Sequence, residues 1–373
     1  MTTDETRTAW ARTRALLLAR REPGGGWRGR LSESPLATAV AVSALAVVDR
    51  ERHAAAIRRG VDWLASVQHD DGGWGDALTD PANLSATVLA WAACGFAPDP
   101  GIVAATCAEE WLVRHADGIA PERLVHAVLA RYGQDRTFSA PILALLAVAG
   151  KLGPAPGCWE VVPQLPFELA ALPRWIFRLA RLEVVSYALP ALIAVGLVRH
   201  RARPTCCFGG RMIRNLLSTG MLEKLSGLQP ASGGFLEATP LTGFVALSVA
   251  AAGHPGHPVV VRAVDFLLSQ QRPGGGWPVD ADLAQWCTTL AVKALAGEGD
   301  AGQAGEMACE IRNWLLRNQL KERHPYTGAA PGGWAWTDRP GGVPDVDDTA
   351  GVLLALRRLS FEDGKANALA GLR

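Results

Sequence analysis

The sequence lacks the features that mark several large classes of protein. Its 37 Lys and Arg residues balance 36 Asp and Glu residues and form no long basic run, so nothing indicates a nucleic-acid partner. Its seven cysteines contain no C-x-x-C spacing, which favours reduced, buried thiols over a disulfide framework. The first ten residues carry charges where a signal peptide needs an apolar segment. Together these absences indicate a cytoplasmic protein.

A long apolar segment is absent as well. The longest apolar run, Val184–Val198, contains Pro190 and is shorter than the ~20 residues that a membrane-spanning helix needs. We expect it to form a buried helix. A peripheral contact with the inner face of the membrane stays open, because a protein that handles a greasy substrate often needs one.

Apolar residues are abundant, by contrast. Hydrophobic residues make up 49% of the 373 residues, and the 13 tryptophans suit a large apolar interior or cavity. No segment shows the alternation of a β-strand. The length would allow two small domains, but closed helical barrels reach this size as one unit. We therefore expect a single domain over residues 1–373.

A glycine-rich turn recurs along the chain. It has the form Gln, three residues, Gly, one residue, aromatic, and one copy has Arg in place of Gln. The copies are Gln68–Trp74, Gln229–Phe235, Gln271–Trp277 and Arg21–Trp27. A period of about 40 to 50 residues is typical of an array of helical hairpins. We expect the glycine to end a helix in the left-handed conformation, the Gln amide to bond free backbone groups, and the indole to cover the turn.

The segments between these turns alternate in character. A helix with few charges, such as Ala37–Val48, precedes an amphipathic helix, such as Ala54–Gln68. The same alternation predicts the pairs Ser85–Cys94 with Ile102–His115, Pro240–Ala252 with Pro258–Gln271, and Cys287–Leu295 with Glu306–Leu320. The uncharged helices belong inside and the amphipathic helices outside. The sequence therefore predicts an all-α fold, a single α/α barrel of two concentric helix rings with about six hairpins.

Three acidic residues crowd the start of the last predicted helix. Asp345, Asp347 and Asp348 precede the apolar segment Thr349–Leu356. Adjacent carboxyl groups cannot all ionise easily, so the cluster retains a proton, and the helix dipole stabilises the anion left after proton transfer. A helix N-cap accounts for one aspartate but poorly for three, and Thr349 and Ala350 do not suit a calcium loop. The cluster therefore favours an acid catalyst.

These features resemble those of a known family, the squalene–hopene cyclases and other class II terpene cyclases. The turns are similar to the family's Q-x-x-x-G-x-W repeat, and DVDDTA, Asp345–Ala350, is similar to its complete D-x-D-D-T-A signature. Further similar stretches are Gly24–Ala39, Cys158–Pro173 and Gly275–Leu295. The family continues for a long stretch beyond the aspartate motif, whereas this sequence ends at Arg373. It therefore resembles most the short monodomain cyclases of meroterpenoid biosynthesis.

The resemblance implies roles for the three acids. Asp347, the middle aspartate of D-x-D-D, would be the proton donor, with Asp345 and Asp348 as its hydrogen-bonding partners, in a dry chamber that keeps the donor protonated. Full-length relatives also use a histidine to hold the donor in its acidic form. None of the eight histidines here matches it, and His126 is the only candidate.

The resemblance also implies an aromatic lining of the cavity. Aromatic faces attract carbocations but offer no lone pair with which to trap them. Trp336 and Trp286 match cavity positions of the family. Leu179 replaces a further aromatic, and we expect Tyr187 or Phe177 to compensate for it.

The implied activity is the cyclisation of a polyprenyl substrate of farnesyl or geranylgeranyl type, started by protonation of a terminal alkene or epoxide. Direct proton transfer needs no cofactor or metal, so magnesium would matter only for a substrate that carries a diphosphate. The substrate could also carry an aromatic or other polar head group.

Several other interpretations stay open. A non-catalytic isoprenoid-binding α/α barrel would have no reason to keep buried acids. A squalene-type triterpene cyclase would need more room than a single barrel encloses. A protein-prenyltransferase barrel would need zinc bound by Asp, Cys and His, and a glycosidase barrel would need a polar groove. The sequence indicates neither of these last two.

Overall fold

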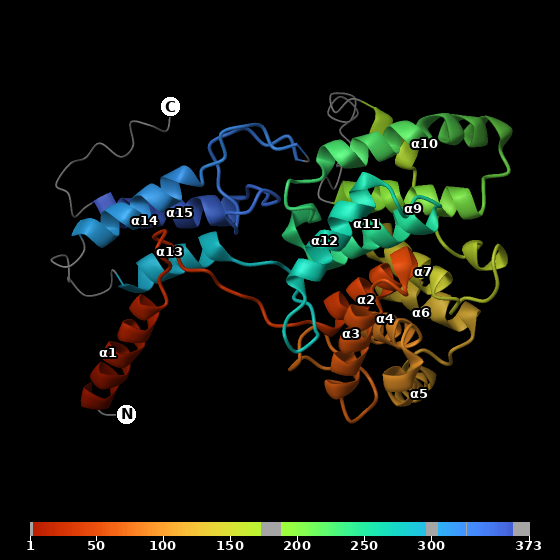
Figure 1. The fold of residues 1–373 in the computed structure, drawn as a ribbon, viewed down its shortest axis with the longest axis horizontal. Helices are drawn as coiled ribbons and strands as arrows, with labels where there is room; N and C mark the ends of the chain where they lie inside the picture. The colour runs from red at the N-terminus through yellow and green to blue at the C-terminus, as the bar shows by residue number, and fades with distance from the viewer. Residues whose placement is uncertain (1–2, 173–187, 296–304, 326, 361–373) are drawn as a thin grey trace. The chain divides into compact units, whose positions relative to one another are not determined.

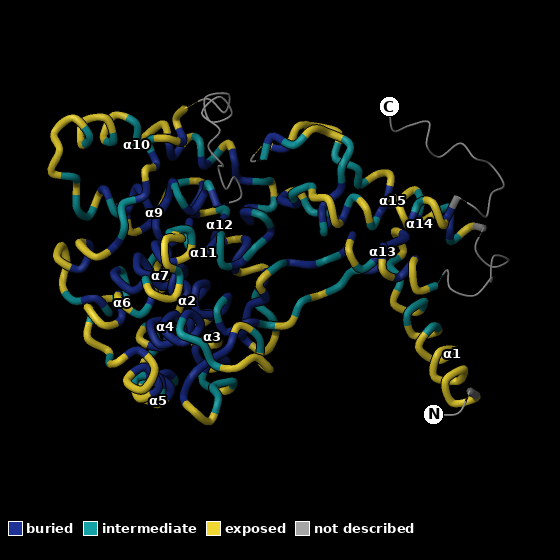
Figure 2. Tube along the Cα trace, turned by 180° about the vertical axis from the view of Figure 1, so that it is seen from behind, coloured by how far each residue is buried: buried dark blue, intermediate teal, exposed yellow. Residues whose placement is uncertain are grey.

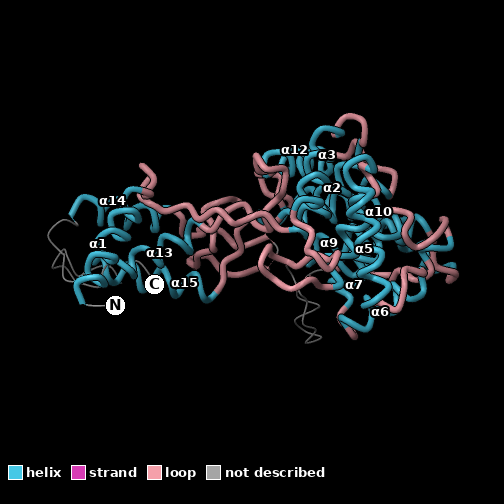
Figure 3. Tube along the Cα trace, turned by 90° about the horizontal axis from the view of Figure 1, so that it is seen from below, coloured by secondary structure: helices cyan, strands magenta, loops and turns pink. Residues whose placement is uncertain are grey.

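The computed structural model describes residues 3–172, 188–295, 305–325 and 327–360. This described part is helical, and its only β-type pairing consists of three isolated bridges (Figures 1 and 3). The chain divides into two compact units. We call Ser32–Ala281 the repeat unit, and Met1–Leu31 together with Asp282–Arg373 the acid unit. The all-α prediction is confirmed, whereas one domain over residues 1–373 stays a prediction.

The repeat unit holds most of the helices. In chain order they are α2 (Pro35–Asp49), α3 (Ala54–Ser66), α4 (Leu84–Cys94), α5 (Pro98–His115), α6 (Pro121–Tyr132), α7 (Arg136–Val148), α9 (Leu189–Ala202), α10 (Phe208–Leu228), α11 (Thr239–Ala251) and α12 (Pro258–Gln270). Short 3₁₀ helices lie at Gly157–Trp159, Phe167–Ala171 and Phe235–Glu237.

These helices form two layers. The inner helices α2, α4, α7, α9 and α11 contact one another in a closed ring, in the order α2, α4, α7, α9, α11 and back to α2. An outer helix packs on each: α3 on α2, α5 on α4, α6 on α7, α10 on α9 and α12 on α11. The inner helices α2 and α4 are small-residue segments buried along nearly their whole length, whereas α3 buries a single stripe (Figure 2). The predicted two-ring pattern is therefore present within this unit.

Each glycine turn ties an outer helix to its neighbour. Gln68 donates from Nε2 to the carbonyl oxygens of Gly72, at 2.7 Å, and Ala104 on α5, at 2.9 Å. Gly72 has a φ of 89°, and the Trp74 indole donates to the Leu64 carbonyl. The equivalent Gln bonds join Gln229 to Gly233 and Val259, and Gln271 to Gly275 and Ala56. The predicted roles of the Gln and the indole are confirmed.

One further turn escaped the sequence analysis. Gln319 donates to the carbonyl of Gly332, which has a φ of 110°, and the Trp334 indole donates to the Leu315 carbonyl. The geometry matches the other turns. An insertion separates Gln319 from its glycine and hides the Q-x-x-x-G-x-W spacing.

The acid unit is smaller. Its helices are α1 (Thr3–Ala19), α13 (Ala284–Leu295), α14 (Gly305–Arg317) and α15 (Val346–Ser360). Helix α15 packs on α13 and α14, and a cluster around Trp27, Trp314 and Trp334 fills the space between them. In the part of the chain that the structure describes, no helix has both the length and the hydropathy required to cross a bilayer.

Candidate active site

The first turn of α15 carries the acid motif, and Asp345 caps it. The Asp345 carboxylate accepts the backbone N–H of Asp348 at 2.7 Å, while its own N–H donates to the Trp334 carbonyl at 3.2 Å. A capping carboxylate of this kind stabilises the helix start and also complements its dipole. The N-cap alternative therefore explains Asp345, and it leaves Asp347 and Asp348 unexplained.

The two remaining acids occupy different environments. Asp347 is exposed at the edge of a groove, whereas Asp348 is only 4% exposed. Burial, the hydrogen bond with Asp345 and the charges of Asp345 and Asp347 together raise the pKa of Asp348 from 3.8 to about 7. A carboxyl group with this pKa keeps a proton near neutral pH, which ordinary aspartates do not. We expected the shielded proton on Asp347, but the helix turns residue 348 inward and residue 347 outward.

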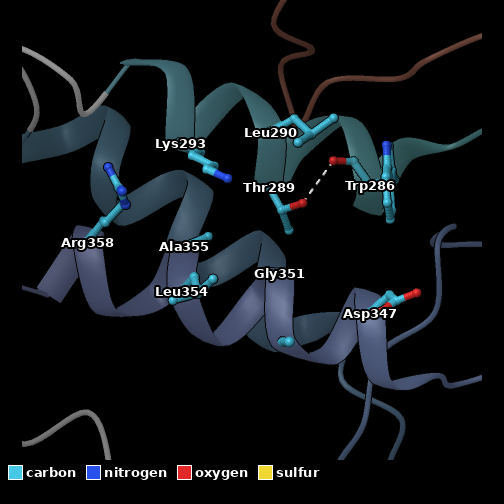
Figure 4. Close-up of a pocket in the computed structure, with 10 residues that line it drawn as sticks. Trp286, Thr289, Leu290, Lys293, Asp347, Gly351, Leu354, Ala355 and Arg358 are labelled. Atoms are coloured by element: carbon cyan, nitrogen blue, oxygen red, sulfur yellow. Dashed lines mark hydrogen bonds between the residues drawn. The ribbon is translucent and has the colours of Figure 1, made fainter.

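The groove beside Asp347 runs between α13 and α15 and has a volume of about 420 Å³. Trp286 lies near Asp347 at one end, and Lys293 and Arg358 lie at the other end (Figure 4). The remaining lining residues, mainly small or apolar, are Thr289, Leu290, Ala350, Gly351, Leu354 and Ala355. Such a groove suits an elongated apolar molecule with a polar end.

Trp336 supports this groove from its end. Its carbonyl oxygen accepts the backbone N–H groups of Gln285, at 2.9 Å, and Trp286, at 3.1 Å. These two N–H groups belong to the first turn of α13, where no intrahelical acceptor is available. Trp336 therefore holds the start of α13, but it is not among the residues that line the groove.

A buried ion-pair network fixes the loop that carries Trp336. Asp282, 1% exposed, accepts hydrogen bonds from Arg28, Arg339 and Thr337 at 2.6 to 2.9 Å. Burial alone would raise the pKa of Asp282, but the hydrogen bonds from Arg339 and Thr337 and the charge of Arg28 hold it below its usual value. Arg28 also pairs with Asp338 through both terminal nitrogens.

The predicted site residues are therefore distributed as follows. Asp347 and Trp286 line one groove, Asp345 and Asp348 flank Asp347 at the start of α15 without lining it, and Trp336 binds the start of α13. Tyr187 and Phe177 lie outside the described residues. His126 is exposed on α6. No group of three or more His, Cys, Asp or Glu side chains within the described ranges is arranged to hold a metal ion.

Sequence reasoning missed three residues of the site, Gln285, Lys293 and Asp282. The signal for the first two was available, because a Gln and a Lys interrupt an otherwise apolar inner helix, "AQWCTTLAVKAL". Asp282 carried no local signal, since its partners Arg28 and Arg339 lie far from it in the sequence.

Comparisons with known proteins agree with the motifs. Residues 10–224 match the family model of the squalene-hopene cyclase N-terminal domain, and residues 283–372 match the model of the C-terminal domain. The squalene–hopene cyclase of Zymomonas mobilis is 32% identical over 379 residues, covering 82% of this chain and 53% of that protein. The squalene–hopene cyclase of Alicyclobacillus acidocaldarius is 26% identical over 424 residues, covering 95% of this chain and 61% of that protein. The chain spans little more than half the length of these two curated relatives.

Solved structures give weaker likenesses. A variant of the type II terpene cyclase MstE from Scytonema, in complex with geranylgeranyl dihydroxybenzoate, is 16% identical and covers 74% of this chain and 81% of its own, with a TM-score of 0.30. A protein from Actinoplanes is 20% identical and covers 95% and 99%, with a TM-score of 0.29. The assignment rests on the sequence matches, of which the first family model alone spans more than half of the chain. The chain belongs to the squalene–hopene cyclase family of class II terpene cyclases.

Proposed function

We propose that this chain is a class II terpene cyclase that protonates the terminal alkene or epoxide of a polyprenyl substrate. The observation that supports this most is one pair of acids: a buried Asp348 that keeps a proton near neutral pH, beside an Asp347 that lines an apolar groove. An alkene is a weak base, so the acid must stay protonated until the substrate arrives.

In this proposal Asp347 delivers the proton to the substrate and receives it from the buried Asp348, which keeps a proton near neutral pH. The O–H bond of its carboxyl group breaks and a C–H bond forms at the terminal alkene, which leaves a tertiary carbocation on the substrate and a carboxylate on the protein. Internal double bonds of the chain attack the cation in turn, and the last cation loses a proton or captures water. The helix dipole at the start of α15 stabilises the carboxylate, and the indole face of Trp286 stabilises nearby cations.

The groove also suggests a substrate with an anionic head group. Lys293 and Arg358 lie at the end opposite Asp347, about eleven residues of helix or ~16 Å away along α15. This separation suits a farnesyl- or geranylgeranyl-type chain with its terminal alkene at Asp347 and a carboxylate or diphosphate at the two cations. Magnesium would accompany only the diphosphate. No step of the proton transfer requires it.

A membrane contact belongs to the same proposal, because such substrates dissolve in lipid. Helix α10 exposes Phe208, Met212 and Leu216 at helical spacing on one face, with Leu216 81% exposed, and Arg211 lies beside them. An apolar stripe next to a cation fits the interface of an anionic bilayer.

The test uses heavy water. The protein is incubated in it with prenols, prenyl diphosphates and prenylated carboxylates, with and without terminal epoxides, beside the Asp347→Asn variant. An alkene-terminated substrate should give a cyclised product that gains one deuterium at initiation, and Asp347→Asn should lower its yield at least about 1,000-fold. Unchanged product from Asp347→Asn would refute the role of this residue. Binding without product from any substrate would favour the alternative, a non-catalytic isoprenoid-binding protein, and turnover of squalene alone would favour a triterpene cyclase.

A further inference from the structure

Gln285 is an unusual residue for the inner face of a helix pair. Its side chain is 1% exposed, and neither Oε1 nor Nε2 has a hydrogen-bond partner among the described residues. Buried amide groups are almost always hydrogen-bonded, because an unsatisfied buried donor or acceptor is costly. We therefore expect the Gln285 amide to have a hydrogen-bond partner, either a neighbouring polar group or an ordered water.

The first turn of α13 determines the direction in which Gln285 faces. Trp286 lines the groove, Cys287 approaches Gly29, and Thr288 accepts the backbone N–H of Trp27. Successive residues of a helix are turned by about 100°, so these three occupy the groove side and the side toward the N-terminal segment. Gln285 is left on the side that packs on α15.

The first turn of α15 places Asp348 on the side of α15 that packs on α13. Asp347 lines the groove, and Thr349 faces the opposite way, where its hydroxyl accepts the N–H of Trp334. Asp348 lies between them in the helical rotation and is buried, and its Oδ1 has no hydrogen-bond partner within the described part of the chain.

The two side chains also lie at the same level. One turn further along, Thr289 and Gly351 meet: a Cβ on Gly351 would lie 3.3 Å from the Thr289 hydroxyl oxygen. Trp286 and Asp347 face each other across the end of the groove (Figure 4). Gln285 precedes Thr289 by one turn, and Asp348 precedes Gly351 by almost one turn. Trp336, whose carbonyl oxygen accepts the backbone N–H of Gln285, is the third residue here with a buried polar atom that has no partner among the described residues, its indole Nε1.

We propose that the Gln285 amide donates a hydrogen bond to one buried water, shared with Trp336, which in turn donates to Oδ1 of Asp348, and that Gln285 so positions the buried acid that holds a proton beside Asp347. The catalytic role of this hydrogen bond rests on the proposed function, whereas its effect on the acidity of Asp348 can be measured without any substrate. A water at this place would find three polar partners, which is the usual number for a buried water.

The hydrogen bond has a defined chemical effect. Oδ2 of Asp348 is left to share its proton with the Asp345 carboxylate, and a donor on Oδ1 stabilises the anion that forms when the proton leaves. Gln285 therefore makes the buried acid stronger than burial alone would allow. It is a positioning residue, since it acts through the carboxyl group and does not touch the substrate.

Other charged groups around Asp348 are accounted for. On α15 itself the nearest charges are Asp345 and Asp347, while Arg358 and, on α13, Lys293 lie at the far end of the groove. The charges of the N-terminal segment and the loop, Arg28, Arg339, Asp282 and Asp338, bind one another. On α14, Glu310 pairs with Arg21, Arg312 contacts Cys309, Arg317 bonds the Gly24 carbonyl, and Glu306 is exposed. The Gln285 amide is thus the uncharged donor best placed to set the acidity of Asp348.

The test is a titration of carboxyl groups by NMR on protein labelled with ¹³C-aspartate, with no substrate present. Wild type should show one carboxyl titrating near pH 7, and Asp348→Asn should remove it. Gln285→Leu should move this midpoint upward by about one pH unit, a tenfold change in proton affinity, because the anion loses a donor. The matched control is Gln270→Leu, another buried glutamine, which lies in the repeat unit on α12 and should leave the midpoint unchanged.

The possible results separate the two proposals. A midpoint that stays or falls in Gln285→Leu, with a folded protein by circular dichroism, overturns the positioning role. An equal shift in Gln270→Leu overturns it too, because the effect would then be general. Where the substrate is turned over, the rate of Gln285→Leu should fall at a higher pH than the rate of wild type, because the carboxyl group titrates at a higher pH. An upward midpoint without turnover of any substrate supports the role of Gln285 and counts against the cyclase activity alone.

Discussion

The repeat unit and the acid unit use the same helical hairpins and glycine turns, but they treat polar groups differently. In the repeat unit, Gln68, Gln229 and Gln271 each satisfy their amide nitrogens on two backbone carbonyls. In the acid unit, Gln285 and Asp348 are buried with unsatisfied atoms, and a half-exposed tryptophan borders an open groove. Buried side-chain atoms without a partner among the described residues occur in the repeat unit as well, for example Oε1 of Gln229 and Nδ1 of His200, but only those of the acid unit lie beside the acid motif.

The position of the unsatisfied atoms of Gln285 and Asp348, next to the acid motif, indicates where function resides. A protein places strained or unsatisfied groups where a ligand or reaction needs them, and stabilises them by well-formed structure elsewhere. The repeat unit has a pocket of about 370 Å³ that includes Leu197 and His200 in its lining, whereas the groove of about 420 Å³ in the acid unit is the one bordered by an aspartate of the acid motif. The predictions that follow compare matched residues, first between the two units and then within each of them.

The largest contrast should come from two tryptophans. Trp277 in the repeat unit is fully buried and donates from its indole to the Leu267 carbonyl, whereas Trp286 in the acid unit is 41% exposed. We expect Trp277→Ala to lower the free energy of unfolding by about 3 to 5 kcal/mol, and Trp286→Ala to lower it by about 1 kcal/mol or less. Urea titrations measure both. Trp286→Ala should instead reduce cyclisation. Equal losses of stability in the two variants would contradict the difference proposed between the two units.

A smaller effect should appear at the glycine turns. Gly275 has a φ of 104°, and a Cβ there would lie 2.4 Å from the Arg59 carbonyl oxygen. Gly253 has a φ of 96° but nothing within 4 Å of the same position. Gly275→Ala should therefore destabilise the protein by about 3 kcal/mol, from strain and overlap together, and Gly253→Ala by about 1 kcal/mol from strain alone. Thermal melts of the two variants test whether the close approach of the Arg59 backbone to Gly275 adds to the cost of the substitution.

Much of the fold could be predicted because helix spacing and turn chemistry are local. The charge-poor segment Ala37–Val48 and the amphipathic segment Ala54–Gln68 became α2 and α3, and the boundaries agree within two residues. The turn at Gln319 was missed because its insertion is irregular. How helices close into a ring depends on contacts between distant segments, such as α2 with α11, and no local pattern contains them.

The candidate site was predicted less completely. The acid motif is contiguous, so its residues could be read from the sequence, and their roles came from the family resemblance. Which acid is buried depends on how the first turn of α15 is rotated against α13, and the sequence analysis expected the wrong one to be shielded. Asp282 and Gln285 matter through partners that lie on other segments, which a linear pattern does not reveal.

Two buried aspartates of the acid unit should respond to pH in opposite directions. The pKa of Asp348 is raised from 3.8 to about 7, so its contribution to stability is complete below pH 3.8 and is lost as the pH rises through about 7. The pKa of Asp282 is lowered below 3.8, so its contribution is present above pH 3.8 and is lost as the pH falls through the lowered value. We expect Asp348→Asn to stabilise the protein at pH 8 by about 1 to 2 kcal/mol, and Asp282→Asn to destabilise it there. Urea midpoints at pH 3, 5 and 8 that move in the same direction for both variants would contradict this assignment.

The smallest change in stability should come from the exposed face of α10. Met212 and Leu216 are 59% and 81% exposed, so replacing both with Gln removes little buried surface and should change the free energy of unfolding by less than about 0.5 kcal/mol. If this face meets a bilayer, the same double variant loses two apolar side chains from the lipid interface, and its partition into vesicles that contain anionic lipid should fall about tenfold or more. Val261→Gln on α12, where the residue is 49% exposed, supplies the control, because it removes an exposed apolar side chain of the same unit from a different helix. Sedimentation with vesicles distinguishes the outcomes: a similar decrease for all variants means nonspecific adsorption, whereas a decrease confined to the α10 variant indicates that the repeat unit supplies the membrane contact and the acid unit the chemistry.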